Sequence, residues 1–124
     1  MSNKILAPIS VGELLDKISI LEIKESFAQD KDKLKNIRTE LAELRPLCAV
    51  MSEDVQYLYH ELKAVNQDLW HIEDYKRSCE KDKNFGDGFV NAARQVYIKN
   101  DHRAALKRQI NLKTNSVIIE EKIY

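Results

Sequence analysis

The chain has 124 residues, a length that fits one domain whose core needs neither disulfides nor a metal to hold it together. Twenty lysines and arginines balance twenty aspartates and glutamates, so the formal net charge is zero. A neutral domain lacks the overall electrostatic attraction to nucleic acid or to an anionic membrane surface. The composition therefore indicates neither of these partners.

The cysteines and the N-terminus bear on where the chain resides. Cys48 and Cys79 form no Cys-x-x-Cys pair and lie near no clustered histidines, which argues against a zinc site and for a reducing compartment. The first apolar run is too short for a signal peptide, and no run reaches the roughly twenty apolar residues of a membrane span. We expect a soluble cytoplasmic protein with no metal and no cofactor.

The chain begins with an expected arm and a first helix. Residues 4–9 contain Pro8 and several branched apolar side chains, a pattern typical of an extended arm or an edge strand. Ser10 and Glu13 match a capping box, which predicts that a helix starts at Ser10. The helix has two apolar stripes on different sides, formed by Val11, Leu14, Ile18 and Leu21 and by Ile20, Ile23 and Phe27. Such a helix is either central in the fold or shared with a second subunit, and we expect a homodimer.

Two further helices follow. Asp30 or Asp32 can cap the second helix, and Pro46 prevents its regular continuation. Ser52 precedes two acidic residues, as expected at the start of a third helix. Apolar residues then recur every three or four positions to about Asp82, which predicts a helix of unusual length.

A break with two glycines separates the third helix from a fourth. Gly86 and Gly88 would permit the reversal of a helical hairpin, and Asp87 can cap a last helix that runs to about Lys113. The apolar residues 117–119 could pair with the N-terminal arm as a two-stranded ribbon or form a final helical turn. The predicted architecture is a single all-α domain, residues 1–124, built as a four-helix up-and-down bundle with a long hairpin.

Charge is segregated between the last two predicted helices. Residues 51–75 carry six acids against one lysine, and residues 94–113 carry six bases against one aspartate. We expect the two segments to pack as neighbours and offset each other, in preference to an outward basic surface.

Polar residues occupy helix sectors that should face the core. At about 100° per residue, the sector of Phe89 and Val96 in the fourth helix continues with amides and cations. The third helix repeats this pattern, and two glutamates flank a stripe of the first. The candidate binding residues are Glu22, Glu25, Asn66, Glu73, Asn100, Arg103, Lys107 and Asn111. An antiparallel hairpin would bring Glu73 level with Arg103 and Asn66 level with Asn111, and Glu25 could reach Lys107.

These residues allow several interpretations, because burying such groups is costly unless they find partners. They could form a buried salt-bridge and amide network, with Glu73 bound to Arg103 and Glu25 bound to Lys107. They could instead line a pocket for an anionic small molecule, or form a face for a partner helix. A non-enzymatic binding or regulatory module is the leading hypothesis.

The alternative is a small helical enzyme. A Mg²⁺-dependent nucleotide pyrophosphohydrolase would use carboxylates such as Glu22, Glu25, Glu73 and Asp74 as ligands. A chorismate-mutase-like enzyme would use Arg103 and Lys107 to hold substrate carboxylates. Both are analogies without a motif match, so no catalytic residue is assigned.

Four segments of the chain carry a resemblance. Residues 8–18 (PISVGELLDKI), residues 65–74 (VNQDLWHIED), residues 100–111 and the closing EEK-x-Y resemble a family of small uncharacterised bacterial and phage proteins. The resemblance implies a free-standing helical domain of bacterial or viral origin whose signature residues coincide with the polar residues above. It implies no activity, ligand or partner.

Overall fold

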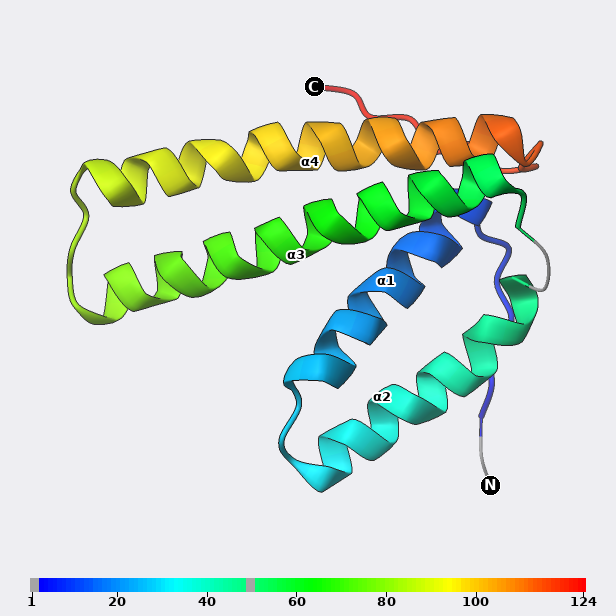
Figure 1. Ribbon diagram of the computed structural model, residues 1–124, viewed down its shortest axis with the longest axis horizontal. Coiled ribbons are helices and arrows are strands. Elements are labelled where there is room, and N and C mark those ends of the chain that lie inside the picture. Colours follow the sequence, from blue (N-terminus) through cyan, green and yellow to red (C-terminus); the bar gives the residue numbers. More distant parts are fainter. Residues whose placement is uncertain (1–2, 49–50) are drawn as a thin grey trace.

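The computed structural model describes residues 3–48 and 51–124 (Figure 1). The described chain forms α1 (Val11–Phe27), α2 (Lys31–Leu44), the short 3-10 helix η1 (Arg45–Cys48), α3 (Glu53–Lys81) and α4 (Asp87–Lys113). The expected all-α fold of four helices is therefore confirmed.

Three of the helix starts are fixed by the side chains that the sequence indicated. Ser10 accepts a hydrogen bond from the Glu13 amide, and Ser52 accepts one from the Val55 amide. Asp30, the first of the two candidates, caps α2. Each cap satisfies amides that have no partner inside the helix, which explains why these helices begin where they do.

The four helices form two hairpins of unequal length. α3 and α4 lie side by side over most of their length, and at 29 residues α3 extends about 40 Å. α1 packs obliquely against one end of this long hairpin, and α2 packs on α1 (Figure 1). α1 thus contacts all three other helices. The first apolar stripe of α1 is buried at Leu14, Ile18 and Leu21. Of the second stripe, Ile23 is buried, Ile20 is partly buried and Phe27 is exposed.

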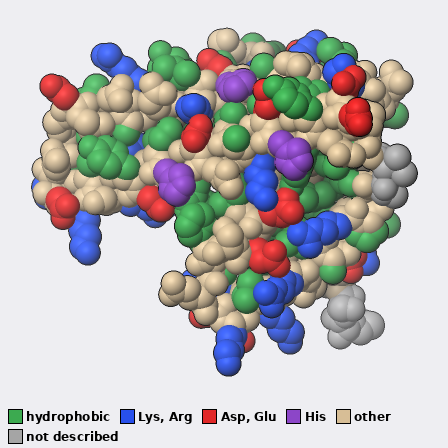
Figure 2. All heavy atoms as spheres, viewed as in Figure 1, with side chains coloured by type: hydrophobic (Ala, Val, Ile, Leu, Met, Phe, Trp, Pro, Cys, Tyr) green, Lys and Arg blue, Asp and Glu red, His purple; other side chains and the backbone are tan. Residues whose placement is uncertain are grey.

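The core lies where α1 meets the long hairpin. Its buried residues include Leu15, Leu41, Val55, Leu62 and Ile110, which come from all four helices. The outer half of the long hairpin extends beyond α1 and α2 (Figure 1). Figure 2 shows hydrophobic side chains gathered in the angle between α1 and the long hairpin, with mixed charges around α1 and α2.

The reversal between α3 and α4 does not use the glycines as expected. Lys83 adopts the left-handed conformation with φ of 55°, whereas Gly86 has a negative φ and is the N-cap of α4. Asp87 lies in the first helical turn instead of capping it. At Gly88 a Cβ atom would lie 2.3 Å from the Tyr75 hydroxyl, so a larger residue there would displace the end of this half-exposed side chain.

The termini do not form the two-stranded ribbon. No strand occurs within residues 3–48 and 51–124, and residues 117–124 form no final helical turn. After α4 the chain turns back and runs along α4 (Figure 1). We call residues 117–124 the tail. The side chains of Glu120 and Glu121 bind Lys107 and Arg108 of α4. The tail is therefore held against α4 and not against the N-terminal arm.

The acidic and basic segments pack as the charge pattern predicts. Lys99 on α4 lies 3.1 Å from Asp68 on α3, and Lys113 lies 3.6 Å from Asp54. Across the part of the chain that the structure describes, no helix combines the length and apolar character needed to cross a membrane.

Candidate functional site

The site begins with a close crossing of α1 and α4 at Gly12. A Cβ atom at this position would lie 2.6 Å from the backbone carbonyl oxygen of Lys107 and 2.9 Å from Oδ1 of Asn111. The Gly12 amide donates a hydrogen bond of 2.7 Å to the same Asn111 oxygen. The absence of a side chain therefore brings the start of α1 into direct contact with α4.

One turn further along α1, the carboxylate of Asp16 lies at the centre of a polar cluster. The residue is 1 % exposed. One of its oxygens accepts from Nε of Arg103 at 2.9 Å and from Nδ2 of Asn66 at 2.9 Å, and the other accepts from Nη2 of Arg103. Polar groups from α1, α3 and α4 thus converge inside the molecule, and the two-pronged contact fixes the orientation of the guanidinium group.

The charge of Asp16 is maintained by these partners. Burial alone would raise its pKa, but hydrogen bonds from Arg103 and Asn66 and the positive charges of Arg103 and Lys107 outweigh it, so the pKa is lowered. The hydrogen bond to Asp16 in turn raises the pKa of Arg103. The pair is therefore ionised at neutral pH.

Lys107 is the second cation of the site and lies next to this pair. Its Nζ atom lies 2.6 Å from a Glu13 oxygen, 3.9 Å from Asp16 and 3.7 Å from Glu120. Glu13 is thus bound to α4, although the capping box predicts that it turns back to the start of α1. Ser116 accepts from the first amide of α1 at 3.1 Å. The start of α1 is therefore held by α4 and by the segment that follows it.

Arg103 lies between two cavities. The first, of about 170 Å³, is lined by α4 and the tail, and we call it the tail cavity. The second, of about 390 Å³, lies between α1, α3 and α4, and we call it the corner cavity. The tail cavity is lined by Asn100, Arg103, Ala104, Lys107, Lys122 and Tyr124. The corner cavity is lined by Ile20, Ile23, Asn66, Leu69, Trp70, Glu73, Asp74, Arg77 and Arg103.

The structure brings most of the candidate residues from α3 and α4 to this region. Asn66 and Glu73 line the corner cavity, Asn100 and Lys107 line the tail cavity, and Arg103 lines both. Asn111 is buried and binds the Gly12 amide at the start of α1. It does not lie level with Asn66 as expected, because Lys113 pairs with Asp54 and so places Asn111 near the start of α3.

The predicted ion pair of Glu73 with Arg103 is wrong. Arg103 binds Asp16, and Glu73 lies 3.5 Å from Lys76, one turn further along α3. The predicted register of the hairpin was off by more than two helical turns. Asp68 lies opposite Lys99 and Asp54 opposite Lys113, so Glu73 lies opposite about residue 94 and not opposite Arg103. The acid that binds Arg103 comes instead from α1.

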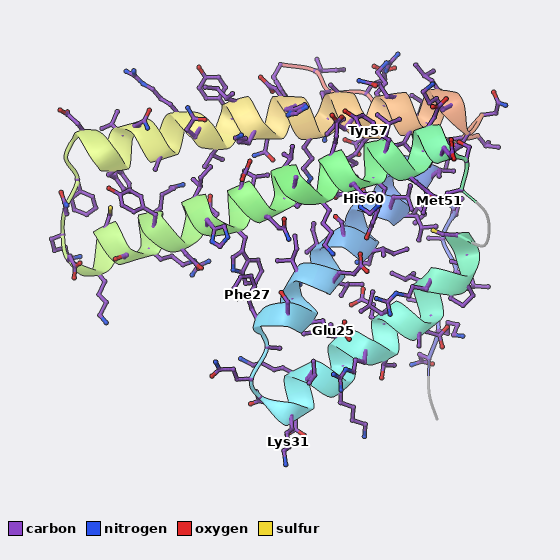
Figure 3. All side chains as sticks on the ribbon, viewed as in Figure 1. Glu25, Phe27, Lys31, Met51, Tyr57 and His60 are labelled. Carbon is purple, nitrogen blue, oxygen red and sulfur yellow. The ribbon has the colours of Figure 1, made fainter. Side chains whose placement is uncertain are left out.

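Glu22 and Glu25 lie on another side of α1. Glu22 accepts from Tyr59 and binds Arg45 at 3.2 Å, and Glu25 binds Arg38 at 3.2 Å. Figure 3 shows Glu25 in the space between α1 and α2. Nine residues separate Glu25 from Asp16, a rotation of about 180°, so the predicted pair of Glu25 with Lys107 is wrong.

The residues that sequence reasoning missed share one face of α1. Gly12, Asp16 and Ser19 follow one another at spacings of four and three, as residues on one side of a helix do. All three are buried. This stripe of a glycine, an acid and a serine could have indicated the face of α1 that meets α4. It is shorter and less apolar than the two hydrophobic stripes of the same helix.

The carboxylates proposed as magnesium ligands do not gather. Glu25 binds Arg38 of α2, and Glu22 binds Arg45 of η1 and Lys63 of α3, whereas Glu73 and Asp74 line the corner cavity. Within residues 3–48 and 51–124, no three side chains of His, Cys, Asp or Glu form a group that could hold a metal ion.

Comparison with known proteins decides the family. A model described as a family of unknown function, DUF6165, matches residues 5–124. The chain belongs to the DUF6165 family. The family match includes α1, the long hairpin and the tail, so every residue of the polar cluster lies within the DUF6165 domain. Searches of curated proteins and of solved structures found no match.

Proposed function

We propose that the protein is a binding or regulatory module that takes up a small anionic molecule in the tail cavity. The observation that carries this proposal is the lining of the cavity. It presents three cations, Arg103, Lys107 and Lys122, together with the amide of Asn100, and none of its lining residues is acidic. A phosphate or carboxylate group is the chemistry that such donors recognise.

The cations are held in place before any ligand arrives. Asp16 engages Nε and Nη2 of Arg103, while Nη1 lies 3.5 Å from Oδ1 of Asn100, at the limit of a hydrogen bond. This edge of the guanidinium retains donor capacity. Glu13 holds the Lys107 amine in the same way. Fixed donors lose little conformational freedom on binding, which favours affinity.

The size of the cavity limits what it accepts. A volume of about 170 Å³ is below the 300 Å³ or more that is usual for drug-sized ligands. It suits an anionic group of a molecule better than a large organic body. Glu120 lies beside Lys107 and binds Lys122 in the tail, so an incoming anion competes with this carboxylate.

Calorimetric titration with inorganic phosphate tests the proposal, with succinate as a second probe and with sodium chloride at matched ionic strength. Lys122→Met removes a lining cation and should weaken phosphate binding about fivefold to tenfold, the loss expected for one charge-assisted contact near the surface. Lys113→Met is a matched control, because both side chains are 47 % exposed and Lys113 lies outside the tail cavity.

Two results would contradict the proposal. One is an absence of saturable binding of either anion at millimolar concentration. The other is equal binding by the Lys122 variant and the Lys113 control, which would indicate nonspecific attraction to surface cations. Preference for phosphate over succinate, or the reverse, would identify the class of anion.

Homodimerisation, a cytoplasmic location and a bacterial or phage origin are predictions of the sequence that we retain as proposals. The two-sided α1 gives little support to a dimer, because most of its apolar side chains are buried within the chain and only Phe27, at its end, is exposed. The outer half of the long hairpin supports one, since Phe85, Val90, Tyr97 and Ile98 are exposed there. Light scattering at micromolar concentration should give twice the chain mass, and a mass of one chain would refute the dimer.

A further inference from the structure

The corner cavity contains a hydrogen-bond acceptor with no donor. The amide nitrogen of Asn66 donates to Oδ1 of Asp16 at 2.9 Å and to Oγ of Ser19 at 2.8 Å. An ionised carboxylate can only accept, so this end of the amide must be the nitrogen. The Ser19 hydroxyl donates its own proton to the backbone carbonyl of Asp16, which leaves its oxygen free to accept. The orientation of the Asn66 amide is therefore determined by chemistry.

The other end of the amide faces the cavity. Asn66 is 6 % exposed, and no described group donates to its Oδ1 atom. Among the described residues, no fully buried side-chain nitrogen or oxygen lacks a partner, so Oδ1 retains contact with open space. The space that Asn66 borders is the corner cavity. A buried, oriented acceptor left without a donor is costly unless a bound molecule or water supplies one.

The rest of the cavity combines an apolar wall with two acidic and two basic side chains. Ile20, Ile23, Leu69 and Trp70 supply the apolar surface. Trp70 is held by Phe27, whose ring stacks on it at 5.3 Å with an interplanar angle of 8°. Figure 3 shows Phe27 at the end of α1, beside α3. A volume of about 390 Å³ falls within the range of small-molecule sites.

The charged side chains at the cavity balance one another, so the fixed acceptor decides which ligand fits. Glu73 and Asp74 line the cavity, and so do Arg77 and Arg103. Two nitrogen atoms of Arg103 are occupied by Asp16, and Glu73 lies 3.5 Å from Lys76. Asp74 and Arg77 are both exposed. The Oδ1 atom of Asn66 is therefore the polar group of the lining whose direction is fixed and whose partner is open, and it takes a hydrogen-bond donor from the ligand.

We propose that the corner cavity is a second site, which binds a compound carrying a protonated amine on an apolar or aromatic body. The amine donates to Oδ1 of Asn66 and is paired electrostatically with Asp74 and Glu73, while the body packs against Trp70. This ligand class is opposite in charge to the one proposed for the tail cavity, and Arg103 lies between the two sites.

Trp70 provides the readout, because it is the only tryptophan of the chain and lines the cavity. Three probes share a phenyl ring and differ in the head group: phenethylamine, phenethyl alcohol and phenylpropionate. Phenethylamine should change the Trp70 emission saturably and bind at least about fivefold more tightly than the other two, the value of a charged contact at a partly exposed site. Equal responses to all three, a preference for phenylpropionate, or no saturable response would overturn the proposal.

Variants separate this site from the surface and from the tail cavity. Asp74→Asn should weaken phenethylamine binding about fivefold and spare the fold, because Asp74 is exposed and has no ion pair among the described residues. Asp101→Asn is the matched control, since Asp101 is exposed, has no ion pair among the described residues and does not line the cavity. If both variants bind equally, the amine site is wrong. Lys122→Met should leave phenethylamine binding unchanged, so failure of the phosphate site leaves this test intact.

Discussion

Replacing Arg103 with methionine removes the main partner of a buried charge. Met retains much of the aliphatic volume of the side chain, so the chief loss is the two hydrogen bonds and the positive charge at Asp16. Breaking a buried pair by removing one partner typically costs about 3–5 kcal/mol, because it leaves the other charge unpaired. Asn66 still donates to Asp16, and Lys107 lies 3.9 Å away. The expected loss of unfolding free energy is therefore at the lower end of this range, about 3 kcal/mol.

Urea unfolding followed by circular dichroism measures this loss. With an m-value of about 1.5–2 kcal/mol/M for a chain of this size, the midpoint should fall by roughly 1.5–2 M. Arg108→Met is the matched control, since Arg108 binds Glu121 on the surface at 2.9 Å and its side chain is 49 % exposed. That variant should lose less than about 1 kcal/mol.

The pH dependence of the Arg103 variant distinguishes loss of charge pairing from loss of packing. In the native protein the lowered pKa of Asp16 stabilises the fold above the unfolded pKa, and this contribution disappears as the pH falls through the folded value. In the Met variant, fewer hydrogen bonds and positive charges oppose the effect of burial on the pKa of Asp16, so this pKa rises. The difference in unfolding free energy between the two proteins should therefore be largest at neutral pH and shrink below about pH 4. A difference that is small at neutral pH, or that persists unchanged in acid, would refute the reasoning.

Three further predictions concern the same region. Gly12→Ala should destabilise the fold by about 1–3 kcal/mol in urea unfolding, because its Cβ would collide with the backbone of α4. Gly86→Ala, whose Cβ would meet Asn84 Oδ1 at an ordinary contact distance of 3.5 Å, should change stability by less than about 1 kcal/mol, and equal effects of the two changes would contradict the close crossing. Acidification of the native protein below about pH 4 should lower its melting temperature as Asp16 is protonated, and a melting temperature that does not change down to pH 2 would refute this. Phe27→Ala should shift the Trp70 emission to longer wavelength and cost about 0.5–1.5 kcal/mol, since it uncovers one face of the indole ring, and an unchanged spectrum would argue against the stack.

The helices themselves followed from local chemistry. Ser10, Asp30 and Ser52 cap their helices because a short oxygen-bearing side chain can reach amides within its own turn. The spacing of apolar residues likewise fixed the length of the long hairpin. Its reversal was located correctly, but the residue that adopts a positive φ is Lys83, which no local rule singles out.

The polar cluster was predicted in part, because helical periodicity gives the face of a residue but not its partner. Arg103 and Lys107 were identified as cations in a sector facing the core. The acid that pairs with Arg103 was not identified, because α1 crosses the long hairpin obliquely and the position of Asp16 along α4 depends on the contact at Gly12. Glu25 was expected to reach Lys107 but binds Arg38 of α2, because the hydrophobic stripes do not show which side of α1 faces α2.

The tail lay beyond what periodicity can predict. Residues 117–119 are short, branched and apolar, a composition that suits a strand. Glu120 and Glu121 instead bind two cations of α4, which holds the tail along that helix. Contacts between a nonhelical segment and a helix have no repeating spacing, so Lys122 and Tyr124 could not be assigned to a cavity from the sequence.

Asp16 is a buried, ionised carboxylate that holds the cations of α4 in place. Titration of its side-chain carboxyl carbon by ¹³C NMR, assigned with Asp16→Asn, measures its protonation. The midpoint should lie below the ordinary value of 3.8 and should rise in Arg103→Met. A midpoint at or above 3.8 in the native protein, unmoved by the loss of Arg103, would contradict this role of Asp16.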